Sequence, residues 1–273
     1  TRPLKDFFGN ELARNLEIAD IIKYRNWRKK QKARRNQNEA ETTVSNGAVN
    51  REVAILKQCF NQAMYHRKET KVEYNPCKGL KPLKEQERDR VLSREEYEAL
   101  ENELSEISEN ARDVVVIGYH LGMRYSEIVN LTWDRVDFKN CCVRLRAEDT
   151  KTKEPRKVPI LSQEAREVFE RRGGNPRRIH GEVFGIKSIR TTFEKACKRA
   201  GIEGFHFHDL RHTCATNLRK AGIDTATVMK ILGHKSVAMY IRYNKVDDED
   251  LKMASEAMAR VEEKLLTPAS VTT

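Results

Sequence analysis

The stretch Leu232-Gly-His-Lys-Ser-Val-Ala-Met-Tyr-Ile-Arg-Tyr-Asn244 places one histidine, one arginine and two tyrosines in a single short segment. His234 follows a glycine at a predicted helix end, and a short amphipathic helix then carries Tyr240 and Tyr243. A tyrosine hydroxyl is a poor nucleophile at neutral pH unless cations and a base surround it. The segment therefore predicts a reactive tyrosine only if the rest of the chain supplies those partners.

Candidate partners lie upstream of this segment. His208 and Arg211 are three residues apart, so they share one face of a predicted helix. Histidine acts as an acid or base near neutral pH, and arginine binds a phosphate through two parallel hydrogen bonds. Arg124 comes directly after a predicted helix end, where its guanidinium can reach a bound phosphate. Each of these residues, taken singly, is more typical of a structural role.

A predicted β-hairpin supplies two candidate lysines. Residues 142–146 and 157–160 have the pattern of short strands around the polar turn 149–155, and they form the only convincing β region in the sequence. Lys151 and Lys153 lie at the tip of this hairpin, where flexible lysines usually face solvent. They gain significance only if a phosphate binds nearby.

Together these residues suit one kind of chemistry. They comprise a tyrosine, two arginines, a lysine and two histidines, without an acidic pair or a glycine-rich phosphate loop. Such a set fits attack of the tyrosine on a phosphodiester without a metal ion, because the cations offset charge that develops on the phosphate oxygens. One proton must leave the tyrosine, and another must reach the departing sugar oxygen.

The charge distribution favours a polyanionic partner. The net charge is +11, and residues 1–87 hold 19 Lys/Arg against 11 Asp/Glu, which leaves 33 against 30 in the remainder. The segment Val246–Leu266 is acidic, with 3 basic and 7 acidic residues. Uniform tuning for solubility does not give a basic front and an acidic tail, although charge alone also fits a merely solvated basic surface.

The helical pattern predicts a mainly α fold with a small antiparallel β-hairpin, divided into two parts. Helices over 19–37 and 48–68 form a small all-α module. Proline and glycine between residues 76 and 82 interrupt the pattern, and the charged residues 83–90 follow as the expected linker. Further helices are expected over 93–104, 113–121, 124–133, 162–172, 186–200, 209–221, 224–232, 236–243 and 248–265. Ser93 and Glu96 predict a capping box at the start of the first of these, and Gly122 is expected to end the second.

Side chains of the first module are expected to pack along one stripe of each helix. In the first helix, Ile21, Ile22 and Trp27 are expected to face inward, and residues 28–35 form a dense basic flank. In the second helix, the stripe at helical spacing consists of Val53, Leu56, Phe60 and Met64.

The remaining composition indicates a soluble, cytoplasmic protein. No apolar run is long enough to span a membrane, and no signal peptide opens the chain. The six cysteines form no C-x-x-C pair, which favours reduced, structural thiols. The chain opens without a methionine and in mid-pattern, as expected if an upstream domain is missing from it.

The motifs, read in order, resemble a known family. Gly122-Met-Arg-Tyr-Ser-Glu-Ile-Val-Asn-Leu131, His208-Asp-Leu-Arg-His-Thr-Cys-Ala-Thr216, Leu232-Gly-His234 and Tyr243 follow the order R…K…H-x-x-R…H…Y. This order, and the step of nine residues from His234 to Tyr243, resembles the tyrosine recombinases, or phage-type integrases. The resemblance covers about residues 90–244, and the N-terminal helices look like the family's core-DNA-binding module.

The resemblance implies a covalent mechanism. Tyr243 would attack the scissile phosphate, form a 3′-phosphotyrosyl link and release a 5′-hydroxyl. Because the ester keeps the bond energy, religation to another strand would need no ATP. Tyr240 is also chemically competent, but the family spacing favours Tyr243 and assigns Tyr240 to packing.

The resemblance also assigns roles to the cations. Arg124 and Arg211 would clamp the non-bridging oxygens of the phosphate. Lys151 aligns best with the family lysine, which would protonate the leaving oxygen, and Lys153 competes with it because alignments slip at hairpin tips.

The histidines and one carboxylate complete the implied site. His208 and His234 would hydrogen-bond the phosphate, and His208 is the better candidate for the base. Glu127 would orient the site without touching the phosphate. No cofactor and no metal are expected.

The resemblance implies a two-domain clamp around double-stranded DNA. A core-DNA-binding domain over 1–82, a linker over 83–90 and a catalytic domain over 91–245 would precede a C-terminal helix and tail over 246–273. We expect this last segment to dock on a neighbouring subunit. A homotetramer would join two recombination sites through a four-way Holliday junction, with accessory DNA-bending or directionality factors as further partners and no membrane partner.

Several functional alternatives stay open. The expected function is integration or excision of a phage or mobile element in a bacterial or archaeal nucleoid. Resolution of chromosome dimers, and type IB topoisomerase chemistry, rest on similar motifs. A zinc site built from His206, His208, His212 or Cys214 is a weaker reading, because no H-E-x-x-H motif is present. A non-catalytic DNA-binding protein would not need every motif residue.

Overall fold

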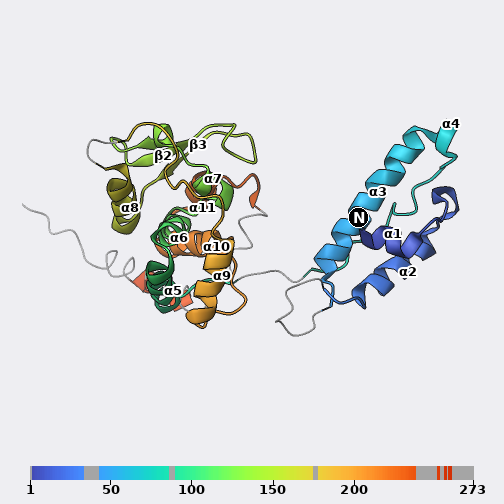
Figure 1. Ribbon diagram of the computed structural model, residues 1–273, viewed down its shortest axis with the longest axis horizontal. Helices are drawn as coiled ribbons and strands as arrows, with labels where there is room; N and C mark the ends of the chain where they lie inside the picture. Colours follow the sequence, from blue (N-terminus) through green and yellow to red (C-terminus); the bar gives the residue numbers. More distant parts are fainter. Residues whose placement is uncertain are drawn as a thin grey trace, which may run out of the picture. The chain divides into compact units, whose positions relative to one another are not determined.

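The chain forms two compact units, Thr1–Glu87 and Arg88–Thr273 (Figure 1). The computed structural model describes residues 2–33, 43–85, 90–174 and 178–237, together with the pairs 251–252, 255–256 and 258–259. Tyr240 and Tyr243 lie outside the described residues, as do most of the predicted helices over 236–243 and 248–265.

The described part of the first unit consists mainly of helices and their connections. Its elements are α1 (Arg2–Phe8), η1 (Ala13–Asn15), α2 (Ile18–Lys29), α3 (Asn46–Tyr65) and α4 (Arg67–Thr70). The prediction of one helix over 19–37 was wrong in its extent, because α2 ends at Lys29. Beyond that end, Lys32 pairs with Thr43 in an isolated β-bridge. Among the described residues of the predicted basic flank, only Arg28 and Lys29 are therefore in α2.

Apolar side chains of α2 and α3 form the core of this unit. Phe60 is buried, and Val53, Leu56 and Met64 pack against the same cluster, which confirms the predicted stripe of α3. Ile21 is buried as predicted. The side chain of Asn50 on α3 forms hydrogen bonds with Leu83 and Glu85, which belong to the expected linker.

A buried ion pair joins α2 to α3. Ile22 was predicted to face inward but is 43% exposed, and the fully buried residues of α2 are Ile21 and Tyr24. The Tyr24 hydroxyl donates a hydrogen bond to Glu52 at 2.6 Å, and the Arg28 guanidinium contacts the same carboxylate at 3.0 Å. A buried carboxylate requires such partners. Arg28, which the sequence placed in the basic flank, is therefore used inside the unit.

The second unit packs helices against a small sheet, as the sequence predicted. The antiparallel sheet has the order β1-β2-β3, with strands Val136–Asp137, Cys142–Leu145 and Arg156–Pro159. The helices are α5 (Arg94–Ile107), α6 (Glu109–Leu121), α7 (Tyr125–Val129), η2 (Trp133–Arg135), α8 (Gln163–Gly173), α9 (Arg190–Arg199), α10 (Asp209–Lys220) and α11 (Thr225–Leu232). In Figure 1 the strands lie at one end of the unit and α5 and α9 at the other.

Several local predictions for this unit are confirmed. Ser93 caps α5 in a capping box with Glu96, and Gly122 ends α6 in a left-handed conformation. The predicted hairpin is present as β2 and β3. The helix predicted over 124–133 was wrong in its extent, because α7 ends at Val129 and a 3-10 turn follows. The strand β1 was not predicted.

Helix α6 is the centre of the second unit. Its apolar side chains are buried on nearly all sides, and α5, α7, α8 and α10 pack around it. Asp113 on this helix is fully buried, and Arg171 and Arg172 of α8 neutralise its carboxylate. This packing fixes the C-terminal end of α6, from which the motif containing Arg124 begins.

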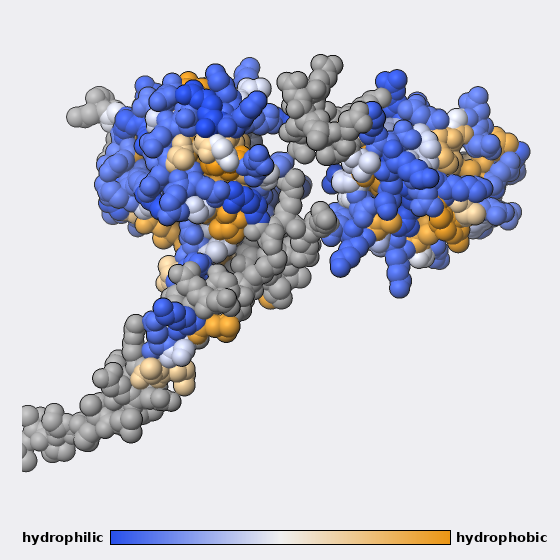
Figure 2. Space-filling model, turned by 90° about the horizontal axis from the view of Figure 1, so that it is seen from below, coloured by the Kyte–Doolittle hydropathy of each residue, from blue (hydrophilic) through white to orange (hydrophobic). Residues whose placement is uncertain are grey.

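The six cysteines are free thiols. No helix among the described residues has the length and apolar character of a membrane span. Figure 2 shows that hydrophilic residues cover most of the visible described surface of each unit, with hydrophobic residues in smaller patches.

Gly122 provides a test of the packing between α6 and α11. A Cβ at Gly122 would lie 2.5 Å from Leu232 Cδ2, and φ is +59°. We expect Gly122→Ala to lower the free energy of unfolding by about 2–4 kcal/mol, from backbone strain plus overpacking. Gly201→Ala is the matched control, because φ is +70° there and a Cβ meets nothing within 4 Å. Urea denaturation should show a loss of only about 1 kcal/mol for this control. Equal losses would contradict the close packing.

Candidate active site

The C-terminal end of α11 presents backbone carbonyls that the helix itself leaves without donors. Gly233 adopts a left-handed conformation with φ +68°, and the N–H of His234 donates back to the carbonyl of Met229 at 2.9 Å. The last carbonyls of a helix need other donors, and the helix dipole makes this end partly negative. Cationic donors are therefore favoured here.

Three arginines from three different elements supply those donors to three consecutive carbonyls. Arg156 Nε, at the start of β3, donates to the carbonyl of Ile231 at 3.0 Å. Arg211, on α10, donates to the carbonyl of Leu232. Arg124 Nη2, at the N-cap of α7, donates to the carbonyl of Gly233 at 3.2 Å. The two arginines predicted as phosphate clamps thus meet at one helix end.

Arg211 also connects this helix end to the end of α6. Its side chain is buried, and Nη1 donates to the carbonyl of Gly122 at 2.8 Å. Arg124 follows Gly122 by two residues, so a single arginine bridges the two turns that carry Arg124 and His234. One guanidinium therefore holds together two turns that are far apart in sequence.

Glu127 is the carboxylate that orients Arg124. It accepts hydrogen bonds from the backbone N–H of Arg124 at 2.8 Å and from Arg124 Nη1 at 2.9 Å. The Glu127 side chain is 1% exposed. Burial acts to raise its pKa, but bonds from Arg156 and Arg124 outweigh this and hold the pKa below its usual range. Glu127 is therefore ionised at neutral pH.

Arg156 is a site residue that the sequence reasoning missed. It binds Glu127 with Nη1 at 3.0 Å and Nη2 at 2.6 Å, and its side chain is 6% exposed. One signal was present, because strand alternation puts Arg156 on the same face as the buried Val158. An arginine on the inward face of a strand predicts a buried acidic partner, although not which one.

The two histidines lie beside these cations. His234 is buried, and its burial together with the charges of Arg211 and Arg124 lowers its pKa from 6.5 to about 3. His208 is the N-cap of α10 and is more accessible to solvent. Partial desolvation of its ring, and then the charges of Arg211, Arg124 and Lys151, lower the pKa of His208. Both rings are therefore neutral at neutral pH.

The turn between β2 and β3 brings a lysine toward the same place. Lys151 is exposed on this turn, and its charge contributes to the lowered pKa of His208. Lys153 is also exposed but has a left-handed backbone with φ +54°. A salt bridge of 3.0 Å between Glu154 and Lys235 ties the turn to the segment that follows α11.

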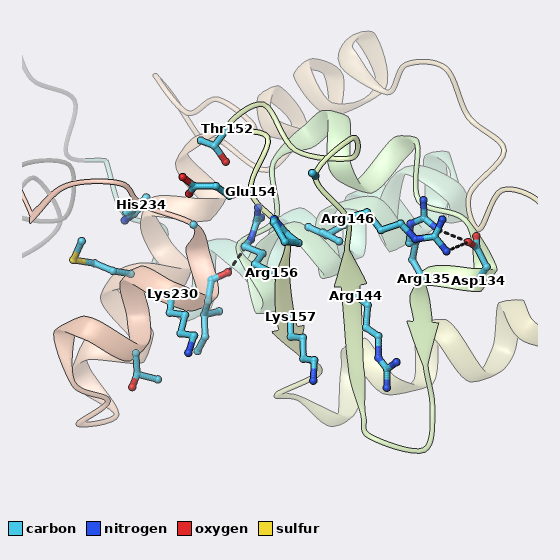
Figure 3. Close-up of a pocket in the computed structure, with 17 residues that line it drawn as sticks. Asp134, Arg135, Arg144, Arg146, Thr152, Glu154, Arg156, Lys157, Lys230 and His234 are labelled. Carbon is cyan, nitrogen blue, oxygen red and sulfur yellow. Dashed lines mark hydrogen bonds and ion pairs between the residues drawn. The ribbon is translucent and has the colours of Figure 1, made fainter.

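A basic groove lies beside the site, between the outer face of the hairpin and α11 (Figure 3). Its volume is about 920 Å³, and His234 and Gly233 lie at its edge. Figure 3 shows Arg144 and Lys157 projecting side by side from neighbouring strands, with Lys230 on α11. The cationic lining residues are Arg135, Arg144, Arg146, Arg156, Lys157 and Lys230, and the acidic ones are Asp134 and Glu154.

The arrangement suits an anionic ligand rather than a metal ion. Among the described residues, no three His, Cys, Asp or Glu side chains are grouped so that they could hold a metal. His208 and His212, which the zinc reading paired, have ring centroids 5.5 Å apart in an edge-to-face contact. Arg124, Arg211 and the neutral His208 and His234 can instead surround a phosphate. The predicted nucleophile, Tyr243, lies outside the described residues.

Comparison with known proteins gives both sequence and fold relatives. A family model described as the phage integrase family matches residues 90–250. The shufflon-specific DNA recombinase of Escherichia coli is 29% identical over 84% of this chain and 60% of its own length. The integrase of Salmonella phage P22 is 32% identical over 51% of this chain and 40% of its own length. Tyrosine recombinase XerA of Thermococcus kodakarensis is 30% identical over 65% of each protein.

Solved structures show the same fold at low identity. The Tn1549 transposon integrase, in complex with circular intermediate DNA, matches with a TM-score of 0.67 and 18% identity over 93% of this chain and 91% of that one. A lambda integrase dimer bound to a COC′ core site matches with a TM-score of 0.68 and 17% identity, covering 90% and 88% of the two chains. The chain spans between two fifths and two thirds of the three curated relatives.

The lowered pKa of His234 makes a prediction about its protonation. The folded chain takes up this proton only near pH 3, whereas the unfolded chain takes it up near 6.5. This group therefore contributes stability that is complete above about pH 6.5 and is lost as the pH falls toward 3. The Cε1 proton resonance of His234 should not shift between about pH 8 and about pH 5. The resonance is assigned by its loss in His234→Gln, and added imidazole is the titrating reference. A midpoint near 6.5 would contradict the site geometry.

Proposed function

The chain belongs to the phage integrase family, and we propose that it is a site-specific recombinase that cleaves and rejoins DNA strands through a 3′-phosphotyrosyl link. The match to this family confirms the resemblance that the motifs indicated. One observation carries the proposal: Arg124, Arg211, His208 and His234 come from three separate segments and gather around the end of α11, and His234 lies nine residues before Tyr243.

The arginines bind the scissile phosphate in this proposal. Arg124 donates one N–H to the carboxylate of Glu127 and one to the carbonyl of Gly233. Other N–H donors of its guanidinium can therefore bind a non-bridging oxygen. Arg211 contacts the same end of α11 and adds a second positive charge beside Arg124. Because both side chains are held by the protein before DNA arrives, little reorganisation is needed as negative charge develops.

The proton transfers follow from the protonation states. Neutral His208 accepts the proton of the Tyr243 hydroxyl as the tyrosine oxygen attacks phosphorus. The bond from phosphorus to the 5′ oxygen breaks, and Lys151 gives a proton to that oxygen. His234 stays neutral and donates a hydrogen bond to the phosphate. Rejoining runs the same steps in reverse with another 5′-hydroxyl, so no external energy source is consumed.

The first unit is the core-DNA-binding part in this proposal. Residues 1–87 carry the larger share of the net positive charge, with 19 Lys/Arg against 11 Asp/Glu, and Arg28 of the basic flank is used in an ion pair inside the unit. We infer that the two units bind duplex DNA together. A tetramer, a four-way junction and docking of residues 246–273 on a neighbour belong to this proposal, as does localisation with chromosomal DNA.

The relatives bear on the biological role. An integrase and a shufflon-specific recombinase are among them, which supports integration, excision or rearrangement of a mobile element. XerA is the basis for the second candidate, resolution of chromosome dimers. The proposal commits to the first, because the shufflon-specific recombinase is matched over 84% of this chain, against 65% and 80% for two XerA relatives.

The basic groove is proposed as a contact for the DNA backbone. Arg144 and Lys157 are directly opposite each other in the sheet, and like charges at such positions repel unless an anion separates them. Lys157 and Lys230 form no ion pair with any residue that the structure describes, whereas Arg144 is paired with Asp137. DNA phosphates would satisfy this unbalanced charge.

The nucleophile can be identified with nicked duplexes of random central sequence. A nick lets the cleaved strand end diffuse away, so the covalent adduct accumulates and can be captured and sequenced. We expect the wild-type chain and Tyr240→Phe to form the adduct on a selected sequence, and Tyr243→Phe to form none. An adduct that persists in Tyr243→Phe would contradict the assignment. Relaxation of any plasmid without sequence preference, and without recombinants, would instead favour topoisomerase chemistry.

The groove is tested by the salt dependence of DNA binding. We expect Lys157→Gln and Lys230→Gln each to reduce the slope of log Kd against log salt concentration by about 1, because each loses one phosphate contact. Lys195→Gln is the control, since it removes the same charge from an exposed site on α9. Its slope should equal that of the wild type. Equal slopes in the wild type and the three variants would show that the groove does not contact the DNA backbone.

A further inference from the structure

We propose that Arg156 is a positioning residue for the cleavage step, which keeps the charge and orientation of Arg124 available to the phosphate. This inference rests on the proposed function and concerns a residue outside the predicted catalytic set. Arg156 lies at the start of β3, between the hairpin and α11 (Figure 3).

The contacts of Arg156 are specific to an arginine. Its guanidinium makes a two-pronged contact with Glu127 at 3.0 and 2.6 Å, while Nε reaches the carbonyl of Ile231 at 3.0 Å. One planar fork thus holds a carboxylate and a helix end at the same time. A lysine at this position would keep the charge but could not make the parallel bonds.

The shape of the site is built around this side chain. A Cβ at Gly233 would lie 3.1 Å from Arg156 Cδ and 3.2 Å from its Nη1. The left-handed turn that carries His234 therefore rests directly on the guanidinium. Moving Arg156 would move the carbonyl of Gly233, which Arg124 contacts.

The charge balance explains why a second cation on Glu127 matters. Arg124 and Glu127 alone form a neutral buried pair, and such a pair offers little attraction to a phosphate. With Arg156 the group carries one net positive charge, because two guanidiniums share one carboxylate. Removing Arg156 leaves Arg124 as the sole partner of a buried carboxylate, which would hold it more tightly.

The test separates DNA binding from cleavage. The full chain and the nicked duplex selected by adduct formation are used, and the first-order rate of adduct formation is measured at saturating DNA. We expect Arg156→Gln to lower this rate about 100-fold, with the Kd for DNA changed less than about threefold. Arg156→Lys should cleave about tenfold faster than Arg156→Gln, because lysine restores the charge but not the two parallel hydrogen bonds.

A second-site change tests the charge argument directly. In the double variant Glu127→Gln/Arg156→Gln the carboxylate no longer cancels Arg124, so its rate should exceed that of Arg156→Gln by at least about tenfold. If Arg156→Gln fails to fold, Arg156→Lys takes its place, and its rate must lie at least about tenfold below that of the wild type.

Arg172→Lys is the matched control. Arg172 is also mostly buried, at 12% exposure, and its Nε donates to the buried carboxylate of Asp113 on α6, outside the site. This variant should lower the melting temperature while the cleavage rate of the folded protein stays at the wild-type value. A loss of rate equal to that of Arg156→Lys would show a general packing effect and overturn the proposal.

Failure of the positioning role and failure of the proposed function would give different results. A wild-type rate in Arg156→Gln, or a double variant no faster than Arg156→Gln, would overturn the positioning role alone. Failure of the wild-type chain to form any adduct would overturn the proposed function and this role with it.

Discussion

The candidate active site depends on the capping of one helix end by arginines. The carbonyls of Ile231, Leu232 and Gly233 receive N–H donors from Arg156, Arg211 and Arg124. Helix ends usually satisfy their carbonyls with water or local backbone turns. Here the donors arrive from β3, α10 and the start of α7, so one helix end fixes three segments that are far apart in sequence. The same bonds hold cationic side chains where a phosphate would bind.

Glu127 completes this arrangement because it prevents the cations from separating. Two guanidiniums share its buried carboxylate, and the ionised form is stabilised in spite of burial. Burial, together with the clustered positive charge, lowers the pKa values of His208 and His234 and keeps both rings neutral. Protonation states needed for phosphoryl transfer therefore follow from the same contacts that hold the structure together. Structure and chemistry cannot be altered independently at these residues.

The sequence predicted what depends on local chemistry. The capping box at Ser93, the left-handed end of α6 at Gly122 and the hairpin turn are encoded by a few neighbouring residues, and these predictions were confirmed. The order of the motifs identified the family because the motifs are specific together. The roles of Lys151 and Tyr243 stay predictions.

Features that depend on distant partners could not be read from the chain. Arg28 was predicted to be part of a basic surface, but Glu52 from another helix draws it inward. Arg156 was missed because its partners, Glu127 and Ile231, are remote in sequence. The helix predicted from Arg124 to Trp133 stops early, because Leu131 and Trp133 are instead bonded to the segment near Val183.

The central claim is that the arginines at the end of α11 are fixed before DNA binds. The most direct measurement is ¹⁵N relaxation of the arginine Nε–Hε groups in the DNA-free chain, with exposed Arg51 of α3 as the reference for a mobile side chain. The account predicts order parameters of about 0.85 for Arg124, Arg156 and Arg211, typical of rigid backbone. Values below about 0.6 for these three residues, like those of flexible groups, would contradict it.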